Sequence, residues 1–347
     1  MSTTQAVARG GAVEAASRRR SLLERVIASD YLVLALTVVY VAAMWFVVPE
    51  MVARDTLLDI LAAMMPLLVV AIGQTFVLIV AGIDLSAPAV LAGASVVGAS
   101  MMTGDGGFAL ATGVPVLVAL VAFVAFGLLV GAFNGFCVTR LGMPAFIVTL
   151  TTMMFFSGFA LFYTASLTDD GSSFGDLPAR FVVIGEGTFH GVPYSVLVAG
   201  AVMAAAHLTL TRTVFGQWLY AIGRNPRAAG ISGVPVRRAV TWAFVISGVC
   251  AAISAILYTG KLETGTPVLG QRILLDIVGG AVIGGVSLFG GKGRVTHTLY
   301  GVLFLTVVDK GLQLLGLELA SVLTIKGLVI LFAAALDALR HRLSLRA

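Results

Sequence analysis

The sequence predicts an all-α polytopic membrane protein with about ten transmembrane helices. Of its 347 residues, 59% are hydrophobic and only 11% are charged, and the mean hydropathy is +1.03; soluble domains carry roughly a quarter charged residues. A spanning helix takes about 20 apolar residues, so ten helices would use about 200 and leave no room for a large soluble domain. The 40 glycines lie mostly inside apolar runs, which favours closely packed helices in a bilayer.

Ten apolar runs, each bounded by charged or turn residues, predict the helices in chain order. They cover residues 31–48, 57–80, 87–102, 112–138, 146–165, 194–211, 240–259, 274–290, 297–315 and 321–337. The first run is too long for a cleaved signal and lacks a small-residue cleavage site, so we expect a retained helix. The predicted organisation is a cytoplasmic tail over 1–30, a transmembrane domain over 31–337 and a cytoplasmic tail over 338–347.

The distribution of basic residues predicts the orientation of the chain. If successive loops alternate sides, one set of loops holds 16 of the 22 lysines and arginines and the other set holds 4. By the positive-inside rule the richer set is cytoplasmic, which places both termini inside. Five helices in each half would also make the two halves inverted relative to each other, a layout that many transporters share.

Several other classes of function find no support in the residues. The cysteines Cys137 and Cys250 lie alone in apolar runs, and the four histidines are scattered singly. We therefore predict no disulfide, no metal site and no catalytic set. The pI near 9.5 comes from charges that flank apolar segments, which indicates contact with lipid headgroups and not with nucleic acid.

The stretch from Gly82 to Ser86 interrupts the apolar sequence between residues 57 and 102. One interpretation is a helix start near the cytoplasmic face, where Ser86 accepts a hydrogen bond, Pro88 fits the first turn and Asp84 stabilises the positive helix end. The other is a broken helix that lines a polar pathway, since ionisable residues at membrane depth are rare without a function. The first interpretation does not exclude the second.

Polar residues inside the predicted spans are further candidates for a pathway. Gln74 and Asn134 lie deep in the second and fourth spans, where they would bond to neighbouring helices or face a polar cavity. Asp309 and Lys310 lie near the outer end of the ninth span and Asp276 begins the eighth, positions that favour snorkelling to the outer interface. The pathway candidates are Gln74, Asp84, Ser86, Asn134, Asp276, Asp309 and Lys310.

The longest cytoplasmic connection, residues 212–239, contains a pattern of turn, short helix and turn. Asn225 fits a helix cap, Pro226 the first helical position and Gly233 the helix end. A two-turn helix with exposed Arg224 and Arg227 is suited to docking a soluble partner. The alternative is a basic loop held to anionic lipid.

Glycines recur at four-residue spacing in two predicted helices, at Gly127, Gly131 and Gly135 and at Gly280 and Gly284. This spacing predicts tight packing along one helix face. The stretch from Gly290 to Gly293 is only a fragment of a phosphate loop, because no Ser or Thr follows Lys292 and no glycine lies five residues before Gly291, so we expect a turn. The chain therefore carries no nucleotide-hydrolysing motif, and we expect no cofactor on it.

Three spaced motifs, taken in order, resemble those of one known family. They are Gln74 with Gly82-Ile83-Asp84-Leu85-Ser86, then Gly223-x-Asn225-x-x-Ala228-Ala229-x-x-Ser232-Gly233, then Ile283-Gly284-Gly285-Val286-Ser287-Leu288-Phe289-Gly290-Gly291-x-Gly293. From about residue 57 to 337 the chain resembles the ribose-type permease subunits of bacterial ABC sugar importers. It departs from that pattern at Ala87-Pro88-Ala89, where Val-Gly-Ser is common, and at Asp309-Lys310, where uncharged polar residues are usual.

The resemblance implies a transport subunit and not an enzyme. It implies a second permease subunit, identical or different, in a bacterial inner membrane, two cytoplasmic ATPases that bind ATP and Mg, and a periplasmic binding protein that delivers the solute. The implied coupling segment, which seats on the ATPase, comprises Arg224, Asn225, Pro226, Arg227, Ala228, Ala229 and Gly233. Pentose, hexose, sugar alcohol and a furanosyl signal molecule remain open as solutes. The alternative is an ion-coupled secondary transporter or facilitator that uses Asp84, Asp276 or Asp309.

Overall fold

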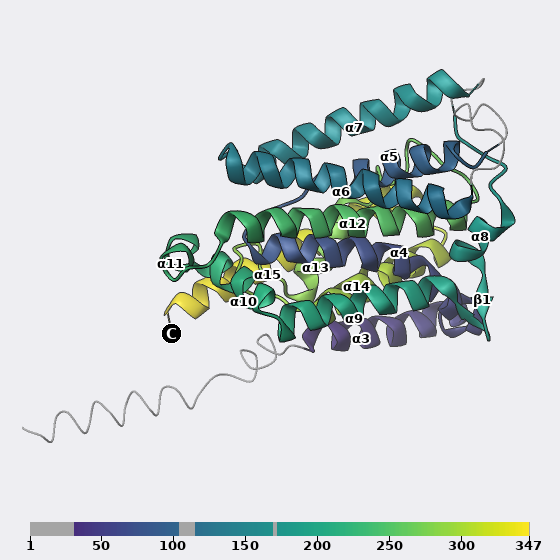
Figure 1. The fold of residues 1–347 in the computed structure, drawn as a ribbon. Coiled ribbons are helices and arrows are strands. Elements are labelled where there is room, and N and C mark those ends of the chain that lie inside the picture. The colour runs from purple at the N-terminus through teal and green to yellow at the C-terminus, as the bar shows by residue number, and fades with distance from the viewer. Residues whose placement is uncertain (1–30, 104–114, 169–171, 347) are drawn as a thin grey trace, which may run out of the picture.

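The computed structural model describes residues 31–103, 115–168 and 172–346 (Figure 1). It is a bundle of helices that run roughly along one common axis. The predicted tail over 1–30 lies outside the described residues.

The elements follow one another in this order: α3 (Leu32–Val47), η1 (Pro49–Val52), α4 (Arg54–Ile79), α5 (Ala87–Ser100), α6 (Val116–Arg140), α7 (Ala145–Leu167), α8 (Ala179–Glu186), β1 (Thr188–Phe189), β2 (Val192–Pro193), α9 (Tyr194–Arg212), α10 (Val214–Arg224), α11 (Pro226–Ile231), α12 (Val236–Leu262), α13 (Leu274–Gly284), α14 (Val295–Leu314) and α15 (Leu319–Arg346). Each of the ten predicted ranges holds a helix.

Within the described ranges, five helices are long and apolar enough to cross a membrane, namely α4, α6, α7, α9 and α12. Shorter apolar helices cover Leu32–Val47, Ala87–Ser100, Leu274–Gly284 and Leu319–Phe332. These helices confirm an all-helical polytopic membrane protein. The count of ten spans stays a prediction.

Some elements were not predicted. The connection between the fifth and sixth predicted spans contains α8 and a small antiparallel hairpin in which Thr188 pairs with Pro193. The predicted cytoplasmic loop contains α10, whose buried residues Gly216, Leu219 and Ile222 follow one another at three-residue spacing, as expected for a helix with one packed face. Helix α15 continues through most of the predicted C-terminal tail.

Two central helices, α4 and α12, carry much of the core. Helix α6 packs on α12 through its glycines: a Cβ at Gly127 would meet the carbonyl oxygen of Gly248, and one at Gly131 would lie 2.5 Å from the carbonyl oxygen of Phe244. Gly280 of α13 faces Val302 of α14 in the same way. The predicted packing role of both glycine series is confirmed.

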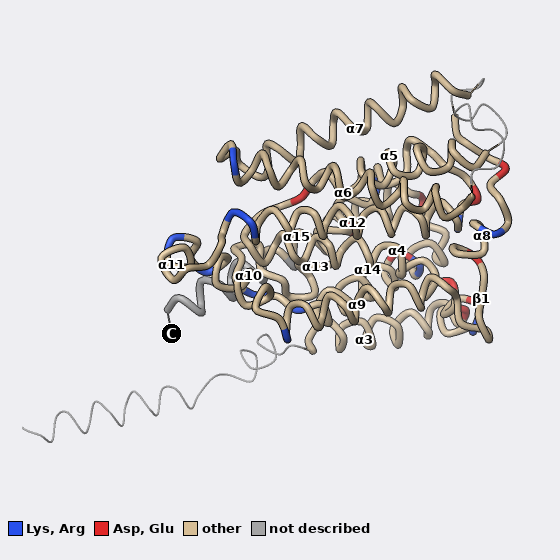
Figure 2. Tube along the Cα trace, in the orientation of Figure 1, with Lys and Arg blue, Asp and Glu red and all other residues tan. Residues whose placement is uncertain are grey.

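The charged residues are unevenly distributed along the bundle (Figure 2). Lysines and arginines gather toward the end that carries α10 and α11, and the acidic residues lie mostly toward the opposite end, where α8 and β1 are found. This separation follows the pattern that the positive-inside rule requires.

Candidate functional site

The first break in the helical bundle lies between α4 and α5. Helix α4 ends at Ile79, and the chain turns through Ala81, a non-glycine residue with φ of 60°. A left-handed backbone costs an L-residue roughly 1–2 kcal/mol. The turn is held by helix-ending hydrogen bonds, including one from the Gly82 N–H to the Val77 carbonyl at 2.9 Å. Residues 82–86 then run without regular structure to the start of α5.

The carboxylate of Asp84 is buried at this break, with 1% of the residue exposed. Its Oδ1 accepts hydrogen bonds from the Ser86 N–H at 2.9 Å and the Ser86 hydroxyl at 2.6 Å, and its Oδ2 accepts one from the Ser247 hydroxyl of α12 at 2.8 Å. Three hydrogen bonds, one from a backbone N–H and two with hydroxyl groups, therefore offset the cost of burying this carboxyl group.

Further polar residues extend the network around Asp84. Asn134 of α6 donates from Nδ2 to the Ser86 hydroxyl oxygen at 2.8 Å and accepts from the Thr152 hydroxyl of α7 at 2.8 Å. With its nitrogen turned toward the Asp84 carbonyl, the Gln74 amide donates to that oxygen at 3.0 Å and accepts from the Asp84 N–H at 3.2 Å. We call the set the Asp84 cluster: Gln74, Asp84, Ser86, Asn134, Thr152 and Ser247.

The Asp84 cluster brings together four of the seven predicted pathway candidates. The prediction that Ser86 caps α5 is wrong, because its side chain makes no capping hydrogen bond and is held by Asp84 and Asn134 instead. Pro88 does lie in the first turn of α5, as predicted. The lining of a pathway by these side chains stays a prediction.

A second break follows α12. Glu263, directly after the helix, is again a non-glycine residue with positive φ, 53°. Residues 263–273 form turns and one isolated bridge, in which Gly265 pairs with Phe174. A Cβ at Gly265 would lie 2.9 Å from the Ser95 carbonyl oxygen, and one at Gly270 would lie 2.9 Å from the Pro88 carbonyl oxygen. The segment therefore runs along α5 from its last turns to its first.

The two short helices α5 and α13 consequently begin next to each other and run to opposite ends of the bundle. The end of α5 contacts α7, where Ser100 and Tyr163 share a hydrogen bond of 2.8 Å. The end of α13 leads into residues 285–294, which contact α10. Two interrupted segments in corresponding positions of the two halves are a recognised indication of a transporter's binding site. We call residues 84–88 and 265–276 the α5–α13 junction.

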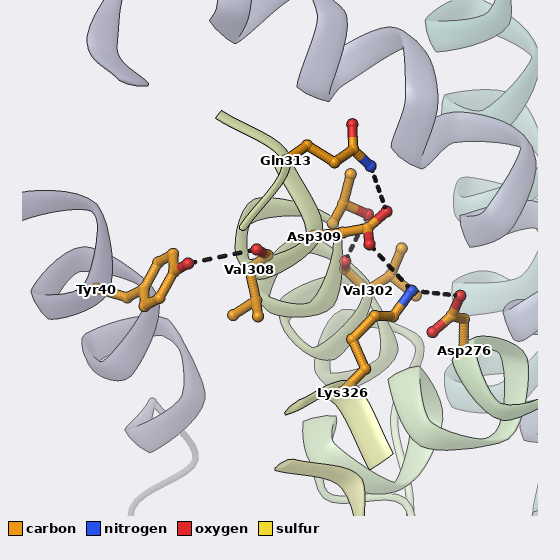
Figure 3. A network of polar contacts seen from close by, with 8 residues as sticks. Tyr40, Asp276, Val302, Val308, Asp309, Gln313 and Lys326 are labelled. Atoms are coloured by element: carbon orange, nitrogen blue, oxygen red, sulfur yellow. Dashed lines mark hydrogen bonds and ion pairs between the residues drawn. The ribbon is translucent and has the colours of Figure 1, made fainter. Parts of the chain in front are cut away.

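An ionic cluster lies beside the start of α13 (Figure 3). Lys326 of α15 donates to Asp276 Oδ2 at 2.9 Å and pairs with Asp309 Oδ1 of α14 at 3.4 Å, and Gln313 donates to the other oxygen of Asp309 at 3.2 Å. Lys310 pairs instead with Asp59 of α4 at 3.0 Å. We call Asp276, Asp309, Gln313 and Lys326 the Lys326 cluster.

The burial of Asp276 and Lys326 does not agree with side chains that reach the outer interface. Asp276 and Lys326 are only 7% and 9% exposed, so the prediction that Asp276 reaches the outer interface is wrong. Its carboxylate is paired inside the bundle with the ammonium group of Lys326, which offsets part of the cost of burying a charge. The Lys310–Asp59 pair is more exposed, at 25% and 67% of the side chains, as a pair near a helix end would be.

The junction also includes polar residues that the sequence analysis did not select. Gln271 and Arg272 follow Gly270 directly and are exposed in the single chain, and Ser247, Thr152 and Lys326 complete the two clusters. In the sequence, Gly265, Pro267 and Gly270 lie between two apolar runs, and this pattern indicates that residues 263–273 are irregular.

The predicted turn, short helix and turn is confirmed in the segment after α10. The Asn225 Oδ1 accepts from the N–H groups of Arg227 and Ala228, both at 3.0 Å, Pro226 begins α11, and Gly233 follows with φ of 83°. Arg224 and Arg227 are exposed, and Ile231 at the end of α11 is 90% exposed. An apolar side chain flanked by cations is a surface suited to a protein partner.

A glycine contact joins this segment to the first break. A Cβ at Gly223 would meet the Ile79 carbonyl and the Gly291 backbone, and the Gly291 N–H donates to the Ile79 carbonyl at 2.8 Å. The Tyr220 hydroxyl donates to the Gly293 carbonyl at 2.8 Å. Burial raises the pKa of Tyr220, with Arg294 opposing the shift, so the hydroxyl stays a donor at neutral pH. The third motif is thus a turn that holds α10 against the end of α4.

No group of three or more His, Cys, Asp or Glu side chains in the part of the chain that the structure describes could hold a metal ion. The two clusters place buried hydrogen-bonding and ionic side chains around the beginnings of α5 and α13.

Comparison with known proteins agrees with this reading. The family described as "Branched-chain amino acid transport system / permease component" matches residues 56–334. The chain is 32% identical to ribose import permease protein RbsC of Haemophilus influenzae, over 86% of this chain and 90% of that protein. It is 34% identical to D-allose transport system permease protein AlsC of Escherichia coli, over 78% and 79%, and 32% identical to galactose/methyl galactoside import permease protein MglC of H. influenzae, over 79% and 83%. No solved structure matches the chain.

Proposed function

The chain belongs to the family of branched-chain amino acid transport system permease components, and we propose that it is the permease subunit of an ATP-driven importer for a monosaccharide or related polyol. The observation that carries the proposal is the similarity over most of both chains to permeases named for ribose, allose and galactose import. The solute within this class is not assigned.

The proposed complex contains a second permease subunit, identical or different, two cytoplasmic ATPases that bind ATP and Mg, and a periplasmic solute-binding protein. It lies in the inner membrane of a bacterium, with ten spans in two inverted halves and both termini cytoplasmic. Two features support the ATPase partners: the exposed α11 with Arg224, Arg227 and Ile231, and the lack of a phosphate loop in the sequence.

We place the translocation pathway at the α5–α13 junction. Irregular backbone at membrane depth is tolerated only where it is buried in protein or lines a polar cavity. Gln271 and Arg272 are exposed in the single chain, and an arginine exposed to lipid at this depth would be costly. Facing the pathway, these two side chains would donate hydrogen bonds to the hydroxyl groups of a sugar.

A movement of the ATPase would be transmitted from α11 to the Asp84 cluster through the contact of Gly223 with Ile79 and Gly291. Movement of α10 and α11 with the ATPase displaces Gly223, which contacts both Gly291 and Ile79. Ile79 is the last residue of α4 and lies just before the turn that leads to Asp84. The route therefore joins the partner surface to the start of α5 over a few residues.

The test is uptake of labelled ribose, allose and galactose into proteoliposomes that contain the permease, its ATPase and its binding protein. We expect uptake that requires ATP on the ATPase side and the binding protein on the other side, and that persists when ionophores dissipate ion gradients. Uptake by the permease alone, driven by a proton or sodium gradient, would establish the secondary transporter instead.

The coupling segment has its own test in the double variant Arg224→Glu, Arg227→Glu. Reversed charges on α11 replace attraction by repulsion across a partner surface, so we expect normal insertion with transport reduced at least about tenfold. Arg212→Glu, which changes an exposed residue at the end of α9, is the control. Equal uptake by the double variant and the control would remove α11 from the ATPase contact.

A further inference from the structure

The ends of α6 and α12 nearest to α11 line a half-open cavity that shares no residue with the Asp84 cluster, the Lys326 cluster or α11. Its volume is about 260 Å³, and it is lined by Phe136, Thr139 and Arg140 of α6 and by Arg237, Arg238, Thr241 and Trp242 of α12. The lining therefore combines three guanidinium groups with two aromatic rings. It contains no acidic side chain.

The floor of this cavity is fixed by contacts between the two helices. The hydroxyls of Thr139 and Thr241 lie 3.0 Å apart, and each also lies within hydrogen-bond distance of a carbonyl of its own helix, Gly135 at 2.7 Å and Arg237 at 2.9 Å; with one O–H each, the two hydroxyls make two of these three contacts at a time. A Cβ at Gly135 would lie 2.8 Å from the Thr241 Cα, so the two helices pack this closely because residue 135 is glycine. The site is formed before any ligand binds, which lowers the cost of binding.

The three positive charges in the lining have no internal compensation. Among the residues that the structure describes, no acidic side chain forms an ion pair with Arg140, Arg237 or Arg238, and the first turn of α12 carries no acidic residue. Guanidinium groups bind phosphate oxygens through paired hydrogen bonds. A phosphate group would therefore be attracted to the site by all three arginines.

An apolar stripe leads along α6 to the same cavity. Leu129, Phe133 and Phe136 are 65%, 54% and 52% exposed, and with Arg140 they follow one another at four, three and four residues, which places them on one helix face. Trp242 on the other side of the cavity is 57% exposed. Aromatic rings beside cations, with an apolar track below them, are typical of the boundary between headgroups and acyl chains.

We propose that this cavity binds an anionic phospholipid of the cytoplasmic leaflet. The lipid phosphate lies among the guanidinium groups of Arg140, Arg237 and Arg238, and an acyl chain follows Leu129, Phe133 and Phe136. A soluble protein partner would not reach the apolar track within the bilayer. The proposal rests on the proposed orientation, in which this end of the bundle is cytoplasmic, and does not depend on which solute is transported.

Trp242 provides a local probe for the test. The chain has three tryptophans, so Trp45→Phe with Trp218→Phe leaves Trp242 as the only one. The purified full-length permease is placed in phosphatidylcholine nanodiscs that contain a minor fraction of a brominated lipid. This lipid is either phosphatidylglycerol or phosphatidylcholine, in both cases brominated near the headgroup. We expect Trp242 fluorescence to report at least about fivefold enrichment of the anionic quencher, because about fivefold is the factor for a single cation beside an anionic lipid and three cations line the cavity.

Variants then assign the enrichment to the cavity. Arg140→Gln, Arg237→Gln, Arg238→Gln in the same background should abolish the preference for the anionic lipid. The charge-matched control Arg212→Gln, Arg224→Gln, Arg227→Gln removes the same charge from exposed residues outside the cavity and should keep the preference.

Three outcomes would overturn the proposal. Equal quenching by both brominated lipids would mean that the site does not select a charge. Loss of the preference when millimolar inorganic phosphate is added would identify a site for a free anion, and its loss when the ATPase binds would identify a protein contact. The readout does not involve transport, so a failure here is separate from a failure of the proposed import function.

Discussion

The two breaks of the bundle share a backbone plan and differ in how they stabilise charge. Each follows a long helix, α4 or α12, and turns through a left-handed residue that is not glycine, Ala81 or Glu263. Each leads to a short helix with an aspartate near its beginning: Asp84 lies three residues before α5, and Asp276 lies in the first turn of α13. Asp84 is held by neutral hydroxyl and backbone donors, whereas Asp276 is held by the cation of Lys326.

The two clusters also differ in which parts of the fold they join. In the Asp84 cluster the bonds involve five elements, including the backbone of the break itself through Gln74, so a movement of that backbone disturbs every member. In the Lys326 cluster the contacts join the side chains of three helices, α13, α14 and α15. We infer that the first break responds to the ATPase side and that the second stabilises the opposite side of the bundle.

The largest effect is expected from Lys326→Met, which breaks the second cluster. The variant leaves Asp276 and Asp309 buried or half-buried without a cation, and removing one partner of a buried ion pair costs about 3–5 kcal/mol. We expect a clearly lower thermal midpoint in detergent. Adding Asp276→Asn should restore most of the loss, because the uncompensated charge is then removed.

Lys310→Met is the matched control for that experiment. Its partner Asp59 is 67% exposed, and exposed ion pairs contribute about 0–1 kcal/mol. If Lys310→Met and Lys326→Met lower the midpoint equally, the Lys326 cluster has no special role in stability.

A smaller effect is expected from Gly223→Ala, which disturbs the contact between α10 and the first break. The new Cβ would meet the backbone of both Ile79 and Gly291, and overpacking of this kind costs about 1–3 kcal/mol. We expect ATP-driven uptake to fall by a larger factor than the amount of folded protein does, since the route to Asp84 passes through this contact. Gly200→Ala, with open space around its Cα, is the control, and an equally small change in uptake in both variants would contradict the route.

The smallest effect is expected from Ala81→Gly, which relieves the left-handed backbone at the end of α4. The relief of about 1 kcal/mol is partly offset by the greater freedom of glycine in the unfolded chain. The thermal midpoint should therefore stay the same or rise slightly. A marked fall would show that the Ala81 methyl group contributes packing that outweighs the strain.

The sequence predicted the positions of the helices because a spanning helix leaves a long apolar run, and it identified Asp84 because a charge stands out between two such runs. It did not identify Ser247 or Lys326 as partners, since these lie 163 and 50 residues from Asp84 and Asp276 and meet them only through helix packing. It left residues 260–273 only as a connection between the seventh and eighth predicted spans, because hydropathy does not reveal that residues 263–273 fold back along α5. Helix α10 was missed because it is amphipathic and too short for a span.

The most direct test of the central claim, that the Asp84 cluster controls transport, is uptake by the Asp84→Asn variant. Asparagine retains an acceptor for the Ser86 donors but loses the charge toward which the Ser86 and Ser247 hydroxyls donate, so we expect the complex to assemble normally. The measurement is ATP-driven sugar uptake in vesicles, normalised to assembled complex. We predict a fall of at least about tenfold, equivalent to about 1.4 kcal/mol in the transport barrier. Uptake within about twofold of the unaltered protein would contradict the claim and leave Asp84 as a simple structural residue at the start of α5.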